Sequence, residues 1–84
     1  RAYPSPFGEI LHFEIYLKTA GKVSFELYDV TGRKVTIFTP GILSAGPHHH
    51  SVDTSLLNLP PSSLFVARMV VDGREVKRIK LMTR

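Results

Sequence analysis

The sequence predicts an all-β fold, an immunoglobulin-like antiparallel β-sandwich of about seven strands. Along several short stretches apolar and polar residues alternate with a period of two, which is the pattern of half-buried strands. Gly, Pro, Asn and Asp interrupt these stretches at short intervals. No stretch longer than a turn places apolar residues at i, i+3, i+4 and i+7, so we expect no substantial helix. Two packed antiparallel sheets are the natural arrangement for such a pattern.

The composition bounds the size and class of the molecule. The chain has 84 residues, which predicts a single domain over residues 1–84. Hydrophobic residues make up 43% and charged residues 21%, values that argue against disorder. Without cysteine, the chain offers neither a disulfide nor a thiolate. We predict no membrane-spanning segment, because no apolar run approaches about 20 residues. The first residues show no initiator Met and no signal peptide, so we expect a C-terminal part of a longer protein.

The opening segment, residues 2–8, is expected to lie at a sheet edge or to cap one end of the sandwich. Pro4 and Pro6 fix their own φ angles and cannot donate a hydrogen bond to a sheet ladder. Phe7 follows them, and we expect its ring to enter the core where the chain arrives.

Two strands with regular alternation follow, at about residues 10–17 and 23–30. A turn at residues 29–32 comes next, in which Gly32 is best placed to take a positive φ. It leads to a third strand at about 33–38. The residues expected to point inward from the first two strands are Leu11, Phe13, Ile15, Leu17, Val23, Phe25 and Leu27.

The middle of the chain is interrupted twice, at residues 39–41 and at residues 46–47. A short strand is predicted at 48–52. Residues 53–63 are expected to form a crossing loop whose leucines reach the core. The stretch 64–71 is almost entirely apolar, so we predict that it is a central strand.

The last two strands are predicted to form a hairpin. Asp72-Gly73 is the strongest hairpin signal in the chain and indicates a type I′ turn. The final strand is expected at about 75–82, with Val76, Ile79 and Leu81 as core candidates. Their spacing is not strictly two, which predicts a β-bulge between Val76 and Ile79.

The net charge of +4 is concentrated near the C-terminal end. Such a cluster could bind an anionic polymer, or it could be a solvated strand face whose cations protect an edge from aggregation. The second interpretation is the simpler one. Basic residues are not interleaved with exposed aromatics, so we expect no nucleic-acid partner. The six basic residues are Arg68, Arg74, Lys77, Arg78, Lys80 and Arg84, against Asp72 and Glu75.

The run His48-His49-His50 is the one candidate metal site. On a strand, His48 and His50 point to one face and His49 to the other, so at most two of them could chelate together. A third ligand would have to come from His12 or Asp53. A polar edge strand or loop explains the run more simply, so we predict neither a metal nor a cofactor.

No motif predicts catalysis. The chain has no G-x-S-x-G, P-loop or G-x-G-x-x-G motif, and its carboxylates are scattered. The serines lie in turn-like positions, so no Ser-His-Asp arrangement can be assembled from them. A chain this short and poor in loops cannot easily enclose a site. We therefore expect a non-catalytic module.

Five blocks match known motifs in chain order: residues 3–7, 21–35, 43–48, 59–68 and 73–82. Together they resemble the C-terminal sorting domain of the type IX secretion system (Por secretion type A sorting domain). Residues 3–7 are similar to its Y-P-N-P-F opening, with Ser5 in place of asparagine. Residues 21–35 resemble its central G-k-v…D-x-x-G block. Residues 43–48 and 59–68 are similar to its L-x-x-G-x-H and L-P-x-G-x-Y steps, and residues 73–82 to its terminal block. The positions that match the fold motifs are Pro4, Pro6, Phe7, Asp29, Gly32, Gly46 and Pro60.

The resemblance implies a sorting signal. Such domains of Bacteroidetes-type bacteria direct a passenger protein from the periplasm across the outer membrane, to the outer-membrane surface or the medium. The implied partners are the outer-membrane translocon, a shuttle protein and a sortase-like protease, which usually removes the domain and joins the passenger to anionic lipopolysaccharide. The signal is attributed mainly to the terminal strands, here about residues 71–84. The implied recognition residues are Val71, Asp72, Gly73, Arg74, Val76, Lys77, Arg78, Lys80, Leu81 and Met82.

Two other functions fit the same residues. The flagellar-hook-capping immunoglobulin-like domain shares the P-N-P-F opening and the D-x-x-G block, and would make the chain a structural assembly module. A retained module of the secretion machinery could instead bind lipopolysaccharide or a partner protein through its basic strand. Salt-sensitive glycan binding would distinguish that case from the other two.

Overall fold

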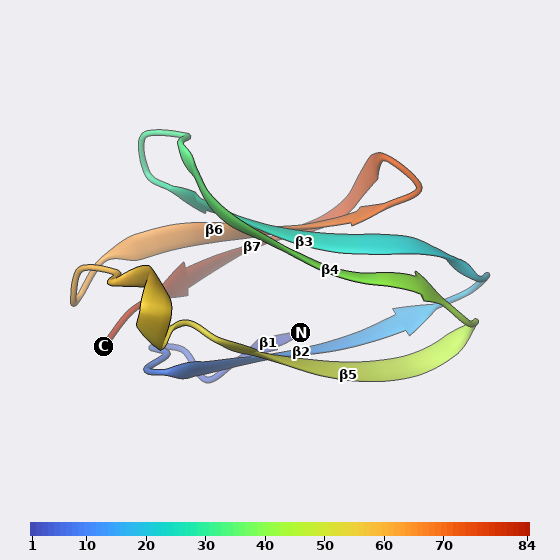
Figure 1. Cartoon of the computed structure of the whole chain (residues 1–84), viewed down its shortest axis with the longest axis horizontal. Helices are drawn as coiled ribbons and strands as arrows, with labels where there is room; N and C mark the ends of the chain where they lie inside the picture. Colours follow the sequence, from blue (N-terminus) through green and yellow to red (C-terminus); the bar gives the residue numbers. More distant parts are fainter.

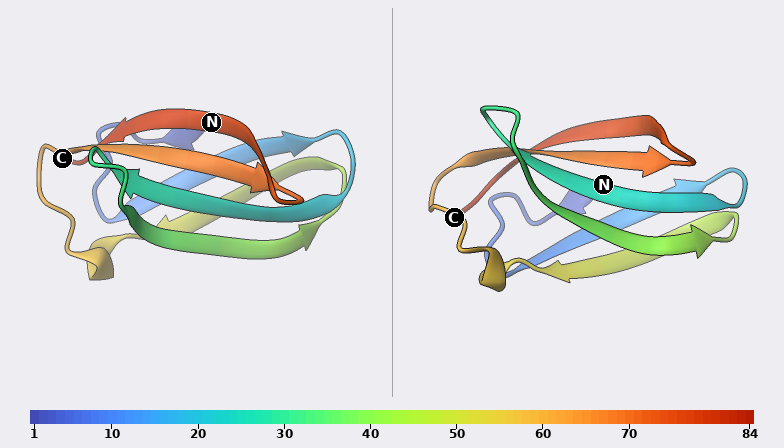
Figure 2. Two further views of the ribbon diagram at one scale, coloured as in Figure 1. Left: turned by 90° about the horizontal axis from the view of Figure 1, so that it is seen from above. Right: turned by 45° about the horizontal axis from the view of Figure 1, so that its top comes forward.

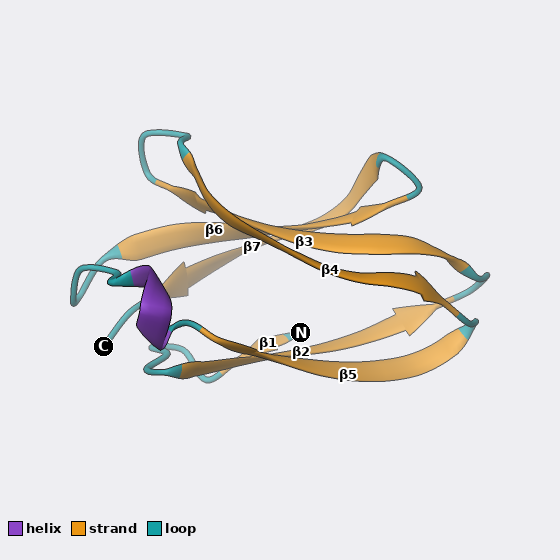
Figure 3. Ribbon diagram, in the orientation of Figure 1, coloured by secondary structure: helices purple, strands orange, loops and turns teal.

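The computed structural model describes residues 1–84 and shows two antiparallel sheets packed face to face (Figure 1, Figure 3). The strands are β1 (Ala2–Tyr3), β2 (Ile10–Leu17), β3 (Gly21–Asp29), β4 (Lys34–Leu43), β5 (Gly46–Asp53), β6 (Leu64–Val71) and β7 (Arg74–Met82). The smaller sheet has the order β1-β2-β5, and the larger has the order β4-β3-β6-β7. This confirms the predicted immunoglobulin-like sandwich of about seven strands. The structure contains no helix of the length and apolarity needed to cross a membrane.

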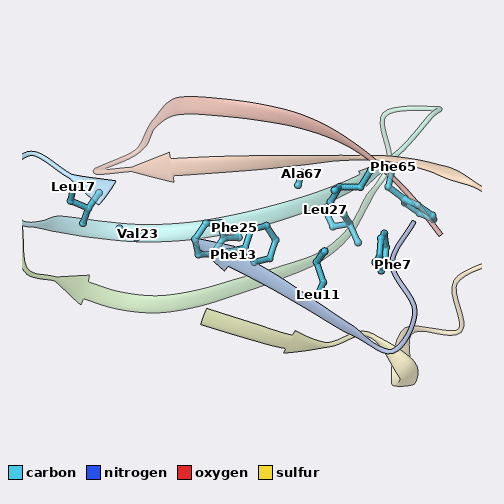
Figure 4. Close-up of a cluster of buried hydrophobic side chains, with 10 residues drawn as sticks. Phe7, Leu11, Phe13, Leu17, Val23, Phe25, Leu27, Phe65 and Ala67 are labelled. Carbon is cyan, nitrogen blue, oxygen red and sulfur yellow. The ribbon is translucent and has the colours of Figure 1, made fainter. Parts of the chain in front are cut away.

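The core lies between the two sheets and runs along the length of the sandwich (Figure 4). The rings of Phe13 and Phe25 stack across it, with centroids 4.4 Å apart. Every residue predicted to point inward from β2 and β3 is buried or packs against the core, because strict alternation places each of them on one face. The buried cluster consists of Phe7, Leu11, Phe13, Leu17, Val23, Phe25, Leu27, Phe65, Ala67 and Leu81.

The opening segment lies where it was predicted, at a sheet edge. β1 pairs with β2 at one edge of the smaller sheet. Phe7 is 1% exposed and fills the end of the core. Its N–H donates to the carbonyl of Met82 at 2.8 Å, and its own carbonyl accepts from Arg84 N at 3.0 Å. The start of the domain is thereby joined to its end.

The predicted break at residues 39–41 is wrong, because β4 continues through it to Leu43. β4 is an edge strand, and an edge strand tolerates Pro40 since half of its N–H groups face no neighbour. Gly41 takes a φ of +97°. The register of β3 and β4 shifts between Val23 and Phe25, so the irregular residues form a bulge and do not end the strand.

The segment after β4 also differs from the prediction. β5 covers Gly46–Asp53 and is longer than the expected 48–52. Within the crossing loop, a single 3-10 turn spans Ser55–Leu57. Leu59 packs against the core as expected, but Leu56 is 88% exposed. The short turn directs the Leu56 side chain outward.

The terminal hairpin has the predicted turn but a displaced bulge. β6 is central, between β3 and β7. Asp72 and Gly73 have φ values of 51° and 81°, as a type I′ turn requires. In the pairing of β6 with β7 the register passes from Glu75 directly to Lys77, so Val76 is the extra residue. Val76 is therefore 54% exposed, and its prediction as a core residue is wrong.

Candidate functional site

The surface that the sequence analysis singled out is the terminal hairpin, β6 and β7. β7 is an edge strand of the larger sheet and has a free side along its length except at Met82, whose carbonyl is bonded to Phe7 (Figure 2). Along it, Arg74, Lys77 and Lys80 are exposed and none of them forms a salt bridge. These three cations are available to a negatively charged partner.

The structure places the implied recognition residues in two environments. Leu81 is 2% exposed and lies in the core, where it packs with Phe65 and the other buried side chains. Val71 is half-buried and also packs against the core. The other eight are exposed on the hairpin: Asp72, Gly73, Arg74, Val76, Lys77, Arg78, Lys80 and Met82.

The hairpin turn is bonded to the start of β3. Asp72 Oδ1 accepts a hydrogen bond from Lys22 N at 2.9 Å, and Asp72 N donates to Lys22 O at 2.9 Å. Gly21 lies so close that a Cβ there would come within 2.8 Å of Val71 Cγ1. A side chain at position 21 would force the β-branched Val71 to shift, which explains the glycine at the start of β3.

A row of alternating charges crosses the outer face of the larger sheet. Lys34 Nζ lies 3.6 Å from Glu26 Oε2, and Arg68 Nη1 lies 3.3 Å from Glu26 Oε1. Arg68 Nε lies 2.8 Å from Glu75 Oε1 as an ion pair, and that oxygen accepts a hydrogen bond from Arg78 Nη2 at 2.7 Å. We call these five residues, which come from all four strands, the charge ladder. No pattern in the sequence predicted the ladder, although Glu26 and Arg68 both occupy outward positions of their strands.

The ladder changes the acidity of its members. The hydroxyl of Tyr28 donates to Glu26 Oε1 at 2.8 Å and is the main reason why the pKa of Glu26 is lowered. The hydrogen bond from Arg78 lowers the pKa of Glu75, and Glu75 in turn raises the pKa of Arg78. Both carboxylates are therefore held in their charged form.

A shallow groove of about 430 Å³ lies beside the ladder. Arg68 and Arg78 line one part of it, and the turn between β3 and β4 lines another, including Asp29 and Gly32. The cation Arg78 of the terminal hairpin and the D-x-x-G block therefore line the same surface groove. Its arginines are already paired with carboxylates, so the groove suits a polar partner surface better than a free anion.

The D-x-x-G residues themselves build the turn. Asp29 Oδ1 accepts hydrogen bonds from Thr31 N at 2.9 Å, from Thr31 Oγ1 at 2.6 Å and from Arg33 N at 3.0 Å. The bond from the Thr31 hydroxyl is the largest cause of the lowered pKa of Asp29. Gly32 has a φ of +88°, which confirms the prediction made for it.

The remaining fold-motif positions lie at bends of the chain and at the end of the sandwich where Phe7 bonds to the last residues. Pro4 and Pro6 lie between β1 and Phe7, and Gly46 begins β5 with a φ of +115°. The carbonyl of Pro60 accepts a hydrogen bond from Thr83 Oγ1 at 2.7 Å. That contact ties the Leu-Pro step to the end of the chain.

The three histidines of β5 are divided between the two faces, as predicted. His50 points inward to Phe25 and Phe38, with ring centroids 6.4 and 6.0 Å away. Its Nε2 is buried without a hydrogen-bond partner, and burial lowers its pKa. His48 Nε2 lies 2.7 Å from Ser44 O, so it is engaged on the same face.

The proposed third ligands lie elsewhere. His12 Nδ1 is 3.1 Å from Nε2 of His49, not of His48 or His50. Asp53 Oδ1 accepts from both the N–H and the hydroxyl of Ser55, at 2.9 and 2.6 Å. No group of three or more histidine or carboxylate side chains is arranged to hold a metal ion.

Comparison with known proteins adds no relative. No protein-family model matches the chain, and no curated protein matches its sequence.

Proposed function

We propose that this chain is a non-catalytic C-terminal sorting domain of the type IX secretion kind, which directs a passenger protein across the outer membrane. The observation that carries the proposal is that three of the family-like blocks, though spread along the sequence, bond to the terminal hairpin or to the residues that directly follow it. The opening block does so through Phe7, the central block through Lys22, and the Leu-Pro step through Pro60, whose carbonyl accepts from Thr83. These contacts help to fix the position of the implied signal.

The hairpin has the physical properties of a docking surface. β7 offers an unpaired strand edge, to which a partner strand can add by backbone hydrogen bonds. Its unpaired cations, Arg74, Lys77 and Lys80, would speed association with an acidic partner and set its orientation.

A secretion assay tests the proposal. Residues 1–84 are fused to a fluorescent protein exported to the periplasm of a bacterium that has the type IX system. We expect the fusion to reach the cell surface or the medium. A fusion carrying Lys77→Gln and Lys80→Gln should be retained in the periplasm, because it lacks two free cations of β7 but keeps the buried Leu81.

The matched control carries Lys18→Gln and Lys22→Gln, which remove two exposed lysines outside the terminal hairpin that form no salt bridge. Lys22 contacts Asp72 through its backbone alone, so the substitution keeps those bonds. We expect this control to be secreted like the unchanged fusion. Retention of the unchanged, folded fusion would contradict the proposal and favour a retained or hook-capping-like module. Equal secretion of both double variants would show that the cations of β7 are not the signal.

A further inference from the structure

The outer face of the smaller sheet carries a second cluster, which the proposed function does not use. His12 projects from β2 and His49 from the neighbouring β5, both on the side away from the core. Their imidazoles are close, with His12 Nδ1 3.1 Å from His49 Nε2. Both rings border solvent: His49 is exposed and His12 is half-buried.

We propose that His12 and His49 form a two-imidazole chelating site for a borderline divalent transition cation, Zn²⁺ or Cu²⁺. Imidazole nitrogen binds such ions at about 2.0–2.1 Å. Two nitrogens at that distance are about 2.9 Å apart in square-planar geometry and about 3.3 Å apart in tetrahedral geometry. The observed separation of 3.1 Å lies between these values. The spacing therefore fits the ion, and each ring must turn by roughly 35–45° so that its lone pair points at the ion and not at the other nitrogen.

Neighbouring side chains hold His12 in place. The ring of Tyr3 stacks on it with centroids 5.0 Å apart and an interplanar angle of 17°. Tyr3 is held in turn by its hydroxyl, which donates to Glu14 Oε2 at 3.2 Å, and by Arg1, whose guanidinium lies 4.6 Å from the ring centroid. Such support lowers the ordering cost of ligand binding.

The charges around the pair partly cancel. Glu14 lies directly opposite His49 in the register of β2 and β5, and its negative charge favours a cation there. Arg1 reduces this effect because its Nη1 pairs with Glu14 Oε1 at 3.1 Å. Since Glu14 is engaged by Arg1 and Tyr3, water would fill the remaining coordination positions. Two protein ligands make this an exchangeable site that binds more weakly than a closed structural zinc centre.

The proton that lies between the two rings can be relocated when the ion binds. In the hydrogen-bonded pair one imidazole donates its N–H to the other ring. When the ion binds, that proton moves to the other nitrogen of the donor ring by tautomer exchange. Both facing nitrogens then present lone pairs, and two neutral rings bind the ion without net loss of a proton.

Titration with Cu²⁺ and Zn²⁺, followed by calorimetry, tests the site in the full chain. We expect saturable binding of one ion per chain, and the Cu²⁺ complex should show two coupled nitrogens by electron paramagnetic resonance. Saturable binding should be lost in His12→Gln and in His49→Gln. The matched control is His48→Gln, on the same strand but the opposite face, which should bind like the unchanged chain. Far-UV circular dichroism without metal verifies that each variant folds.

Three results would overturn the proposal. The first is an unchanged chain that binds neither ion saturably, and the second is loss of binding in His48→Gln. The third is retention of binding in both His12→Gln and His49→Gln. Should the variants fail to fold, metal-induced shifts of the ring ¹⁵N resonances in the unchanged chain decide the question. Shifts confined to His12 and His49 support the site, and shifts confined to His48 and His50 contradict it.

Discussion

Leu81 and Val76 of β7 show how a shift of one residue in the strand register determines whether an apolar side chain contributes to stability. Leu81 is 2% exposed, whereas Val76, at the bulge, is 54% exposed. We expect Leu81→Ala to lower the free energy of unfolding by about 2–5 kcal/mol, since it leaves a cavity. Val76→Ala should change it by no more than about 0.5 kcal/mol. Urea denaturation of both variants measures the difference, and equal losses would contradict the assignment of the bulge to Val76.

His50 makes the core sensitive to mild acid. Burial lowers its pKa in the folded chain, so the fold favours the neutral ring. The unfolded chain binds this proton at pH values near 6.5. Stability is therefore full above about pH 6.5 and falls as the pH drops from there toward the lowered pKa. The lowered pKa values of Asp29, Asp53, Glu26 and Glu75 act in the same sense but at lower pH, because their stabilising contribution is lost only as the pH falls below their ordinary values.

Replacing His50 with leucine should remove the mild-acid effect. The variant also removes a buried nitrogen that has no hydrogen-bond partner, so we expect it to be about 1 kcal/mol more stable at neutral pH. Melting temperatures measured between pH 7.5 and pH 5 test both statements. His49→Leu is the control, because that ring lies on the outer face. A steep fall in the stability of His50→Leu across this range would contradict the role assigned to the ring.

At the scale of elements, the charge ladder links the four strands of the larger sheet. Arg68 lies between Glu26 and Glu75, and its side chain is 32% exposed. For a partly solvated pair we expect a coupling free energy of up to about 1 kcal/mol between Arg68 and Glu75. A double-mutant cycle with Arg68→Met and Glu75→Gln measures it. The coupling should shrink in high salt, and a value that does not respond to salt would argue against an electrostatic origin.

Elements with regular alternation could be predicted from the sequence, and irregular ones could not. β2, β3 and β6 follow the period of two closely, so the bounds of β2 and β6 and the inward faces of β2 and β3 were predicted. β3 spans Gly21–Asp29 and so begins and ends earlier than the predicted 23–30. β4 was cut short because Pro40 and Gly41 are typical of a break in a central strand. Its edge position, which makes them acceptable, depends on the pairing of the sheets. The exact place of the β7 bulge likewise depends on where β6 pairs with it.

The candidate sites depend still more on pairing between strands. That His48 and His50 share a face follows from local geometry and was predicted. That His49, and not either of these, meets His12 follows from the register of β2 with β5. The charge ladder likewise needs the order of four strands. A single sequence shows the alternation along each strand, but it does not show which strands are neighbours.

For the whole molecule, the terminal strand is part of the folding unit. Removing residues 76–84 deletes most of β7, the buried Leu81, and Thr83, whose hydroxyl bridges Ser63 N and Pro60 O. A domain of this size has little stability to lose. We expect the truncated chain to be unfolded, with loss of β-sheet signal in far-UV circular dichroism and of dispersed amide resonances. Retained dispersion would show that β7 is dispensable for folding.

This expectation determines how a secretion assay on the terminal strand must be designed. Failure of a truncated fusion to leave the periplasm would not separate loss of a signal from loss of the fold. Substitutions of Lys77 and Lys80 avoid this ambiguity, because both side chains are exposed.

The hydrogen bonds between Phe7 and the end of β7 also determine how the domain would respond to mechanical load. A pull between residue 1 and residue 84 first peels β1 from β2 and then reaches the Phe7–Thr83 bridge. At that bridge the force passes directly from Phe7 to the last residues, so most of the sandwich bears no load. The parallel arrangement at this bridge means that its bonds are loaded in shear, where they must break together. The Phe7–Thr83 bridge would therefore hold the domain closed when the chain is pulled at residues 1 and 84.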